Sequence, residues 1–515
     1  MAPPDDYGDD ERDTSSPDEE TPLINNSASP INERNKSSNK GGGRSNDSTM
    51  PRSPSSPITS TLFWTVFIVT LGSSLQFGYG TGVMNNTESV IRAYFENELN
   101  QEYTLLQWSF TVSSYGIGGL IGALLGPKVF GRFCGRRTTL LINNCFLLSS
   151  SYMIVVAPVW WYQAVGRVLV GIVAGIATAV VPTYLSEISP VAIRGGIGTT
   201  HQLGITVGIL LSQALSTPSL NLFGSESMWQ WLFAVPLFCG LLQCVVLPLC
   251  PESPSYLYQH QGKEAARAAI VRFQSEEVAD EYLAYIQEED NEGNHTLTVI
   301  QLILDRSLRK QLIVGVMVQL MMQFSGIDAV FYYSSSVFRQ ADVADPELAT
   351  TCLGIVNVFV TIFAIRYMDV AGRKTLLTYS LMGMCASFAT LTASFLLKPV
   401  FPYMDQLSII ATTGIIVCFA FGPGCIAWFI IAEMFPLKGR DSAMAVGIFI
   451  NWVANWLVAL TFPILLKTCH GYTFLIFVAT TAYFCFFARE YVPETKGRTI
   501  REVTEVFRDI PLSTC

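Results

Sequence analysis

Apolar segments long enough to cross a membrane recur along most of this chain. A helix needs ~20 apolar residues to span the hydrocarbon of a bilayer. Twelve such segments flank a hydrophilic stretch at 250–309, and they lie at about 61–83, 106–126, 138–158, 162–185, 197–216, 229–249, 311–335, 350–367, 375–397, 406–432, 442–465 and 472–488. Only 14% of the residues are charged, whereas globular domains carry about 25%. The sequence therefore predicts an all-α membrane protein with twelve transmembrane helices.

Three motifs from the first half of the chain return in the second half in the same order. The matching pairs are Gly135-Arg136-Arg137 with Gly372-Arg373-Lys374, Glu187…Arg194 with Glu433…Arg440, and Pro251-Glu252-Ser253 with Pro493-Glu494-Thr495. In that order, the offsets between partners are 237, 246 and 242 residues. A nearly constant offset predicts two six-helix halves related by duplication, with a substrate site at their interface near the midplane of the membrane.

The alternation of apolar and hydrophilic stretches divides the chain into five parts. They are an acidic Ser/Pro-rich tail at 1–57, a first six-helix half at 58–249, a linker at 250–309, a second half at 310–488 and a tail at 489–515. The first tail has too few apolar side chains to form a core, so we expect it to be disordered. The linker has apolar residues at helical spacing among charged ones, which predicts short amphipathic helices.

Three residues of the first tail resemble an acidic dileucine signal for endosomal sorting. They are Glu19, Leu23 and Ile24. Such a signal would bind a sorting adaptor and give the protein an endosomal pool. The alternative is that they are ordinary composition of an acidic tail, because short motifs of this kind arise readily by chance.

Basic residues in the short loops gather on one side of the predicted bundle. They are Lys128, Arg132, Arg136, Arg137, Arg194, Arg366, Arg373, Lys374, Lys438 and Arg440. Positively charged loops stay in the cytoplasm, so both termini and the linker are expected there, in a protein of the plasma membrane. The sequon Asn85-Asn86-Thr87 then falls on the outer side, where Asn85 is a candidate for glycosylation.

The composition argues against other classes of protein. The 12 cysteines include no CxxC pair and lie mostly in apolar segments, so we expect small hydrophobic side chains rather than disulfides or a metal site. The net charge of −9 argues against a nucleic-acid partner. The loops show no nucleophile–base set and no phosphate-binding glycine loop, so we expect neither an enzyme nor a cofactor.

The apolar segment at 311–335 carries polar residues that are costly in hydrocarbon. Gln319 and Gln323 share one helical face, and Gly326 permits a break just before Asp328. Polar groups at this depth should face the protein interior or a water-filled cavity. Amides and aromatic rings suit a neutral polyhydroxylated solute, which predicts a substrate wall containing Gln319, Gln323 and Asp328. The alternative is that the amides bond neighbouring helices.

Charged residues end several predicted spans on the cytoplasmic side. The candidates for a gate are Arg136, Arg137, Glu187, Arg194, Arg373, Glu433 and Arg440. A carboxylate at the end of an apolar span is costly unless an arginine pairs with it. Ion pairs that join the two halves would stabilise the state closed on this side. The alternative is that the arginines only follow the topology rule.

Several further stretches complete a recognisable set. They include Gln76-Phe77-Gly78-Tyr79, His201-Gln202-Leu203-Gly204, Gly326…Tyr332-Tyr333, Gly422-Pro423-Gly424…Trp428 and Pro493-Glu494-Thr495-Lys496-Gly497-Arg498. Over about residues 60–505 the chain resembles the facilitative glucose transporter family, sugar porters of the major facilitator superfamily. The resemblance implies the major facilitator fold and facilitated diffusion (uniport) of a hexose, D-glucose first, by alternating access. It also implies a cytoplasmic gate made by the charged set, and a sugar site made by Gln202, Gln323, Asn357, Trp428 and Asn455 with aromatic cover from Phe77 and Phe419.

Four positions depart from the family pattern. Met322 stands where the glucose carriers have a second glutamine, Met321 replaces a serine, Asp328 replaces an asparagine and Ala420 replaces a glutamate. Each lost hydrogen bond is worth ~0.5–1.5 kcal/mol net, so a hexose is implied more strongly than glucose itself. Fructose, or a broad range of monosaccharides, is therefore an alternative substrate.

Proton coupling and sensing are two further alternatives. Proton-coupled relatives carry an acid in the first span near an arginine like Arg167, but Gly80 stands in that place, which favours passive uniport. Asp328 keeps a proton-coupled symporter open, because an acid buried at membrane depth could carry a proton. A sugar sensor with the same fold would bind sugar without moving it.

Overall fold

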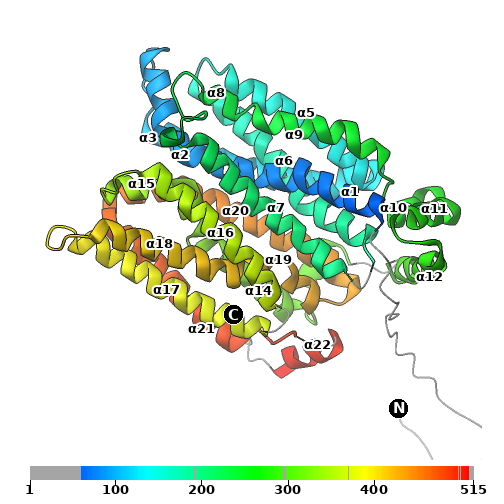
Figure 1. The fold of residues 1–515 in the computed structure, drawn as a ribbon. Helices are drawn as coiled ribbons and strands as arrows, with labels where there is room; N and C mark the ends of the chain where they lie inside the picture. Colours follow the sequence, from blue (N-terminus) through cyan, green and yellow to red (C-terminus); the bar gives the residue numbers. More distant parts are fainter. Residues whose placement is uncertain are drawn as a thin grey trace, which may run out of the picture. The chain divides into compact units, whose positions relative to one another are not determined.

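A computed structural model describes residues 59–509, apart from 191–192, 294–296, 369–370, 497 and 499. The predicted tail signal at Glu19, Leu23 and Ile24 lies outside the described residues. The described part consists of helices joined by short connections and contains no strand (Figure 1).

Six spans make up the first half. The first runs without interruption through α1 (Ser60–Val69), η1 (Thr70–Ser74) and α2 (Leu75–Asn97). The other five are α3 (Leu105–Leu125), α5 (Arg136–Val155), α6 (Trp160–Ile188), α7 (Arg194–Ser216) and α8 (Trp229–Leu232) with α9 (Val235–Val246). Short pieces connect or extend these spans, namely η2 (Gly126–Gly131), α4 (Arg132–Cys134), η3 (Pro218–Leu220) and η4 (Leu247–Leu249).

Six more spans make up the second half. They are α14 (Arg309–Phe324) with α15 (Ile327–Gln340), α16 (Pro346–Met368), α17 (Arg373–Leu397), α18 (Met404–Phe421) with α19 (Pro423–Met434), α20 (Leu437–Cys469) and α21 (Phe474–Tyr491). The short η5 (His470–Thr473) joins the last two, and α22 (Ile500–Asp509) follows them.

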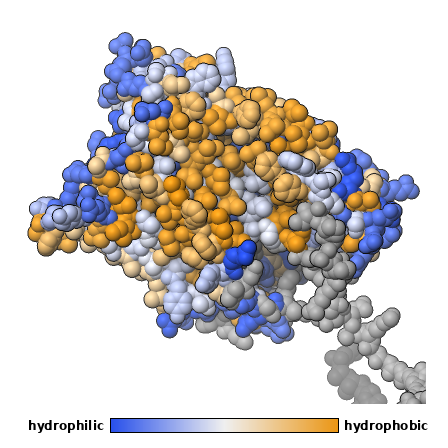
Figure 2. Space-filling model, in the orientation of Figure 1, coloured by the Kyte–Doolittle hydropathy of each residue, from blue (hydrophilic) through white to orange (hydrophobic). Residues whose placement is uncertain are grey.

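The surface and the hydropathy of these helices fit a membrane. Ten described stretches are long and apolar enough to cross one; Lys438–Tyr491 contains both α20 and α21, and the 23-residue α7 is a further long helix. The prediction of twelve transmembrane helices in two six-helix halves is confirmed. In Figure 2, apolar side chains cover the middle of the visible face, and hydrophilic ones gather towards both ends of the helices. Phe63, Phe238 and Phe359 are more than half exposed, as expected for side chains that contact lipid.

Two spans of the second half break in the middle. Gly326, between α14 and α15, has φ +86°, a left-handed conformation that residues with a Cβ rarely adopt. The break that the sequence predicted at this glycine is present. In the other span, α18 ends at Phe421 and α19 begins at Pro423, whose missing N–H has no role at the first helical position.

The two halves meet along three pairs of helices, α3 with α20, α7 with α16 and α2 with α15. Gly116 and Gly119 of α3 face Trp456 and Trp452 of α20, and a Cβ at either glycine would clash with a tryptophan. Small residues at such a contact let two helices approach closely. This contact holds large aromatic side chains of the second half against the first half.

The linker contains α10 (Pro254–Gln261), α11 (Lys263–Phe273), α12 (Glu276–Gly293) and α13 (Val299–Leu304), so the short helices predicted there are present. The helices α11 and α12 share a small apolar core that includes Ile270 and Leu283. On their exposed side Arg267 pairs with Asp280 at 2.8 Å, and this guanidinium lowers the pKa of the Asp280 carboxyl.

Two parts of the linker form hydrogen bonds with different halves. The hydroxyl of Tyr282, on α12, donates to the backbone oxygen of Glu187 at 3.0 Å in the first half. The backbone N–H of Leu297 donates to the oxygen of Lys438 at 2.7 Å in the second half. The linker therefore spans the two halves at the end where α6 and α19 finish.

Candidate functional site

A cavity lies between the two halves and takes its wall from both. The space within it and its mouth is about 720 Å³. The first half contributes residues of α2 and α7, and the second half contributes residues of the broken spans, α16 and α20. Its lining combines uncharged polar groups with aromatic and aliphatic side chains, which is the character of a site for a small molecule.

Eight of the nine residues predicted to bind substrate line this cavity. They are Phe77, Gln202, Gln323, Asp328, Asn357, Phe419, Trp428 and Asn455. The ninth, Gln319, is not among the lining residues. Its amide donates to the backbone oxygen of Ala427 at 2.8 Å and accepts from Asn451 at 2.9 Å. Gln319 thus makes the bonds between helices that were the alternative interpretation of this segment, and its role in binding stays a prediction.

Three amides form a chain that sets the orientation of Gln323. Gln319 accepts from the Asn451 side chain, and Asn451 in turn accepts from Nε2 of Gln323 at 2.9 Å. Because Nε2 of Gln323 is used in this bond, its Oε1 is left without a partner among the described residues. Nδ2 of Asn357, on α16, is also buried and lacks a described partner.

These two atoms define what the cavity offers to a ligand. One is an acceptor and the other a donor, and both belong to side chains that line the cavity. A buried polar atom without a partner costs about 1–3 kcal/mol. A ligand hydroxyl can donate to the first and accept from the second, so binding would remove that cost.

Asp328 lies in the first turn of α15, directly after the break at Gly326. Its Oδ2 accepts from Nδ2 of Asn455 at 2.7 Å, and the same nitrogen lies 3.2 Å from the hydroxyl of Tyr332. The side chain is buried apart from its cavity face, with 7% of its surface exposed. It makes no ion pair with any residue that the structure describes.

Arg167 is a buried cation at the other side of the first span. One terminal nitrogen donates to the backbone oxygen of Gly80 at 2.8 Å, and the guanidinium lies over the ring of Tyr115, 4.7 Å from its centre. Nε and Nη2 have no partner among the described residues. Arg167 therefore lies beside Gly80, the position at which proton-coupled relatives are expected to carry an acid. Gly80 offers it a backbone oxygen and no carboxylate.

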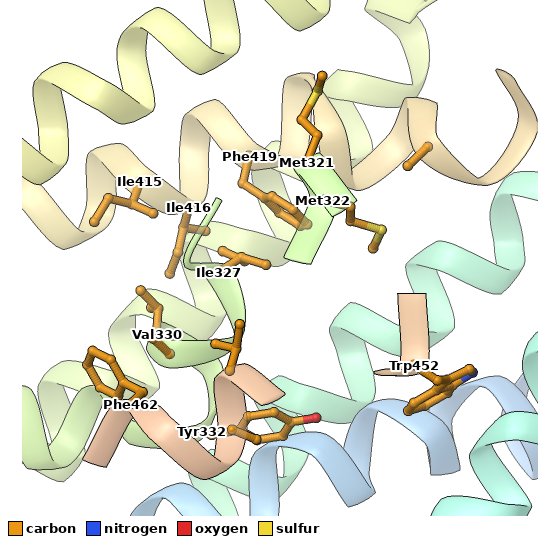
Figure 3. Close-up of a cluster of buried hydrophobic side chains, with 14 of the residues drawn as sticks. Met321, Met322, Ile327, Val330, Tyr332, Ile415, Ile416, Phe419, Trp452 and Phe462 are labelled. Atoms are coloured by element: carbon orange, nitrogen blue, oxygen red, sulfur yellow. The ribbon is translucent and has the colours of Figure 1, made fainter. Parts of the chain in front are cut away.

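Aromatic rings close the apolar part of the cavity. Phe77 lies 5.8 Å from Trp452, and Phe331 lies 6.4 Å from Phe419, measured between ring centres. Figure 3 shows that Met321 and Met322 leave α14 in different directions. Of these two methionines only Met322 lines the cavity. Of the two substitutions on α14, only the one at position 322 therefore changes the cavity wall.

Three threonines that the sequence analysis did not assign to the site also line the cavity. Thr81, Thr206 and Thr361 follow Phe77, Gln202 and Asn357 by four residues each. Residues four apart share a helical face, so the signal was present in the spacing. A single threonine in an apolar helix was too common a feature to single out.

At one end of the cavity, hydrogen bonds join the halves directly. We call this group the inter-half clamp; it consists of Asn85, Asn86, Thr217, Ser334, Ser335 and Thr351. Nδ2 of Asn85 donates to Ser334 Oγ at 2.8 Å, and its Oδ1 accepts from the Ser335 N–H at 3.0 Å. The Ser335 hydroxyl donates to Asn86 at 2.6 Å, and the hydroxyls of Thr217 and Thr351 lie 2.6 Å apart.

The clamp changes the interpretation of the Asn85 sequon. Asn85 has only 2% of its surface exposed, and both ends of its amide are bonded to α15. The sequence showed the sequon but gave no sign of this contact, which joins residues about 250 positions apart.

At the opposite end, the predicted gate residues pair within each half. Arg136 reaches Glu187 at 2.9 Å in the first half, and Arg373 reaches Glu433 at 3.1 Å in the second. Glu187 also accepts from Ser253, and Glu433 accepts from Thr495. The prediction that these acids pair across the two halves is not met in this structure.

The remaining motif residues repeat the same geometry in both halves. Glu252 accepts from the backbone N–H groups of Arg136 and Arg137, and Glu494 accepts from that of Arg373 at 2.7 Å. The side chain of Arg137 donates to the Cys250 oxygen at 2.8 Å. This equivalence supports the duplication inferred from the motifs.

Two gate arginines make no ion pair with any described acid. Arg194 lies over the rings of Tyr282 and Tyr285, about 6 Å from each centre. Nε of Arg194 and Nε of Arg440 are both buried without a described partner. These two arginines come from equivalent positions in the two halves.

Comparisons with known proteins agree with this architecture. Residues 65–507 match the family model described as "Sugar (and other) transporter". The chain is 37% identical to the human solute carrier family 2, facilitated glucose transporter member 4, over 477 residues, covering 89% of this chain and 93% of the relative. It is 36% identical over 465 residues to member 3 from Gallus gallus, covering 88% of this chain and 93% of the relative.

Solved structures of the same superfamily are also similar. The xylose transporter XylE from E. coli, in a partially occluded inward open conformation, matches with a TM-score of 0.73 and 26% identity, over 86% of this chain and 100% of that one. The proton:xylose symporter XylE bound to 6-bromo-6-deoxy-D-glucose matches with a TM-score of 0.73 and 25% identity, over 87% and 99%. By sequence and by fold, this chain belongs to the sugar transporter family of the major facilitator superfamily.

Proposed function

We propose that the protein is a uniporter that moves a hexose, D-glucose first among them, by facilitated diffusion. The observation that carries this proposal is a pair of unpartnered amide atoms, Gln323 Oε1 and Asn357 Nδ2, on two side chains that line the cavity between the halves. They suit a hydroxyl, and the neighbouring rings suit the C–H faces of a sugar. The facilitated glucose transporters among the relatives support the choice of a hexose.

We further propose that transport proceeds by alternating access, and that this structure is the state open towards the linker. Hydrogen bonds of the clamp join the halves at the far end, whereas Glu187 and Glu433 pair within their own halves at the linker end. Rocking the halves would break the clamp and bring the unpaired Arg194 and Arg440 towards the acids of the opposite half. The inward open conformation of the similar XylE structure supports this assignment.

The orientation and location are part of the proposal. The loops rich in Arg and Lys lie at the linker end, so we place that end and both termini in the cytoplasm. We expect the protein in the plasma membrane, with an endosomal pool if Glu19, Leu23 and Ile24 bind a sorting adaptor.

Passive transport is favoured over proton coupling by the surroundings of Arg167. Its guanidinium contacts a backbone oxygen and a tyrosine ring, with Gly80 where an acid would pair with it. Fructose is the second candidate substrate, because Ala420 is a small apolar residue in the cavity wall.

Uptake into vesicles tests these proposals. The full chain in vesicles should equilibrate labelled D-glucose faster than empty vesicles, and an imposed pH gradient should not drive accumulation. Gln323→Ala and Asn357→Ala should depress uptake, whereas Glu102→Ala at an exposed loop position should not. Competition by unlabelled fructose, galactose and mannose would rank the hexoses. Binding without uptake would identify a sensor, and accumulation with the proton gradient would identify a symporter.

A further inference from the structure

The cavity wall contains one acidic side chain and no basic one among the described residues. Among the described lining residues, Asp328 is the only aspartate, and the wall holds no glutamate, lysine, arginine or histidine. The other polar groups are amides, hydroxyls, a thiol and indoles. Asp328 and Ala420 are both departures from the family pattern, so in this chain the acid of the wall lies at position 328 and not at position 420.

Burial disfavours the charged form of Asp328, and two local features offset part of that cost. It lies in the first turn of α15, where the unpaired N–H groups of the helix favour a negative charge. Asn455 donates to Oδ2 at 2.7 Å and so favours the carboxylate further. Within the described residues, nothing donates to Oδ1, and that oxygen is not sealed from the cavity.

The ionisable groups around Asp328 do not neutralise it. On its own helix Tyr332 lies beside Asn455, and on α3 Tyr115 lies 6.4 Å from the Tyr332 ring. Arg167 of α6 lies over the Tyr115 ring and donates to the Gly80 oxygen, and among the described residues it makes no ion pair with Asp328. The neighbouring parts of α14, α16, α18 and α20 present amides, hydroxyls and apolar side chains to the cavity. The carboxylate therefore has a free oxygen and no counter-ion.

We propose that this cavity selects a protonated amino hexose over the corresponding neutral sugar, with Asp328 as the counter-ion of the ammonium group. This inference rests on the proposed function as a hexose carrier. A neutral hydroxyl gives the carboxylate a hydrogen bond in which only the acceptor is charged. An ammonium group adds the Coulomb attraction of an opposite charge, which is strong in a site shielded from water. The ring and remaining hydroxyls keep the contacts proposed for glucose.

Selection of a cation also changes the energetics of transport. A neutral sugar crosses without moving charge, but a protonated amino sugar carries one positive charge inward. Its uptake by a uniporter must then respond to membrane potential, at about 2.3 kcal/mol per charge per 100 mV. Glucose uptake through the same protein must not respond.

Competition and voltage dependence in the same vesicles test the inference. At a pH of about 7, where an amine of this kind is largely protonated, unlabelled D-glucosamine should inhibit labelled D-glucose uptake at about one tenth of the concentration that D-glucose itself requires. At a pH of about 9 the amine is neutral and the preference should disappear. A potassium diffusion potential, negative inside, should accelerate labelled glucosamine uptake and leave glucose uptake unchanged.

Two variants separate the carboxylate from other causes. Asp328→Asn keeps the shape of the side chain, and in this variant glucosamine and glucose should inhibit uptake at equal concentrations. Glu96→Gln removes an exposed acid outside the cavity and should retain the preference for glucosamine. The wild-type pH series and voltage response stand even if Asp328→Asn does not fold. Glucose uptake with no preference for glucosamine at either pH would overturn this inference and leave the proposed function intact. Absence of uptake of both sugars would overturn both.

Discussion

At the scale of single residues, the orientation of each amide in the cavity depends on its neighbour. Gln319 fixes Asn451, and Asn451 fixes Gln323 by accepting from its Nε2. Only this orientation directs the Gln323 oxygen towards a ligand as an acceptor. Gln319, which does not line the cavity, can therefore affect how Gln323 binds a ligand.

Replacing Asn451 should accordingly weaken hexose transport. Asn451→Ala removes the acceptor that holds Gln323, and the loss of one net hydrogen bond of about 0.5–1.5 kcal/mol corresponds to a roughly 2- to 12-fold increase in half-saturation concentration. Gln319→Ala should have a smaller effect, because it acts one step further from the ligand. Concentration-dependent uptake measures both. Equal half-saturation in wild type and Asn451→Ala would show that the amide chain does not orient the site.

The buried amide of Asn85 leads to a second prediction at this scale. A glycosylation enzyme needs an extended, accessible asparagine, whereas Asn85 is in α2 with both polar atoms bonded to α15. In eukaryotic cells, glycosidase treatment should affect the electrophoretic mobility of wild type and Asn85→Gln identically. A mobility shift seen in wild type and lost in the variant would mean that the sequon is modified before the halves close.

At the scale of helices, the apolar pattern predicted which segments form spans better than where they end. The first span was expected at 61–83 but continues to Asn97. Glu88 and Arg92 lie four residues apart on it and pair at 3.3 Å, which lets the helix continue beyond the apolar run. Hydropathy reports the thickness of the membrane and carries no information on how far a helix extends past it.

The break at Gly326 was predictable, because glycine adopts the left-handed backbone conformation of such a break without strain. This break can be tested by a substitution. In Gly326→Ala the new Cβ would lie 2.8 Å from the rings of Phe388 and Phe477, at a φ that costs about 1–3 kcal/mol by itself. We expect a lower melting temperature in detergent and loss of uptake. Gly198→Ala on α7 is the matched control, since no atom lies within 4 Å of the added Cβ. Equal melting temperatures for the two variants would contradict this account.

At the scale of the whole molecule, the motifs predicted the two halves and most of the cavity, but not the contacts that depend on which state is present. The arginines and acids of the gate were identified, yet their pairing within each half follows from the arrangement of the halves in this state. The clamp left no sequence signal, because its members are ordinary Asn, Ser and Thr residues brought together by packing. Contacts that form and break during transport must each be weak. They are therefore made by common polar residues, which do not stand out in a sequence.

The clamp therefore determines how often the far end of the cavity opens. Asn86→Ala removes the bond to Ser335, and Thr351→Val removes the bond to Thr217, each on a different pair of helices. Together they take away two hydrogen bonds between the halves, each worth about 0.5–1.5 kcal/mol net, so the equilibrium should shift about fivefold or more towards the state open at that end. A cysteine introduced as Ser334→Cys in the clamp reports this opening, through its rate of labelling by a thiol reagent that does not cross the membrane, measured on the labelled peptide. Labelling should accelerate in the double variant, and an excess of a non-transported sugar analogue that binds only the opposite state should slow it again. Because the halves rock as units, an unchanged labelling rate would mean that the long contact between α3 and α20, rather than the clamp, holds that end closed.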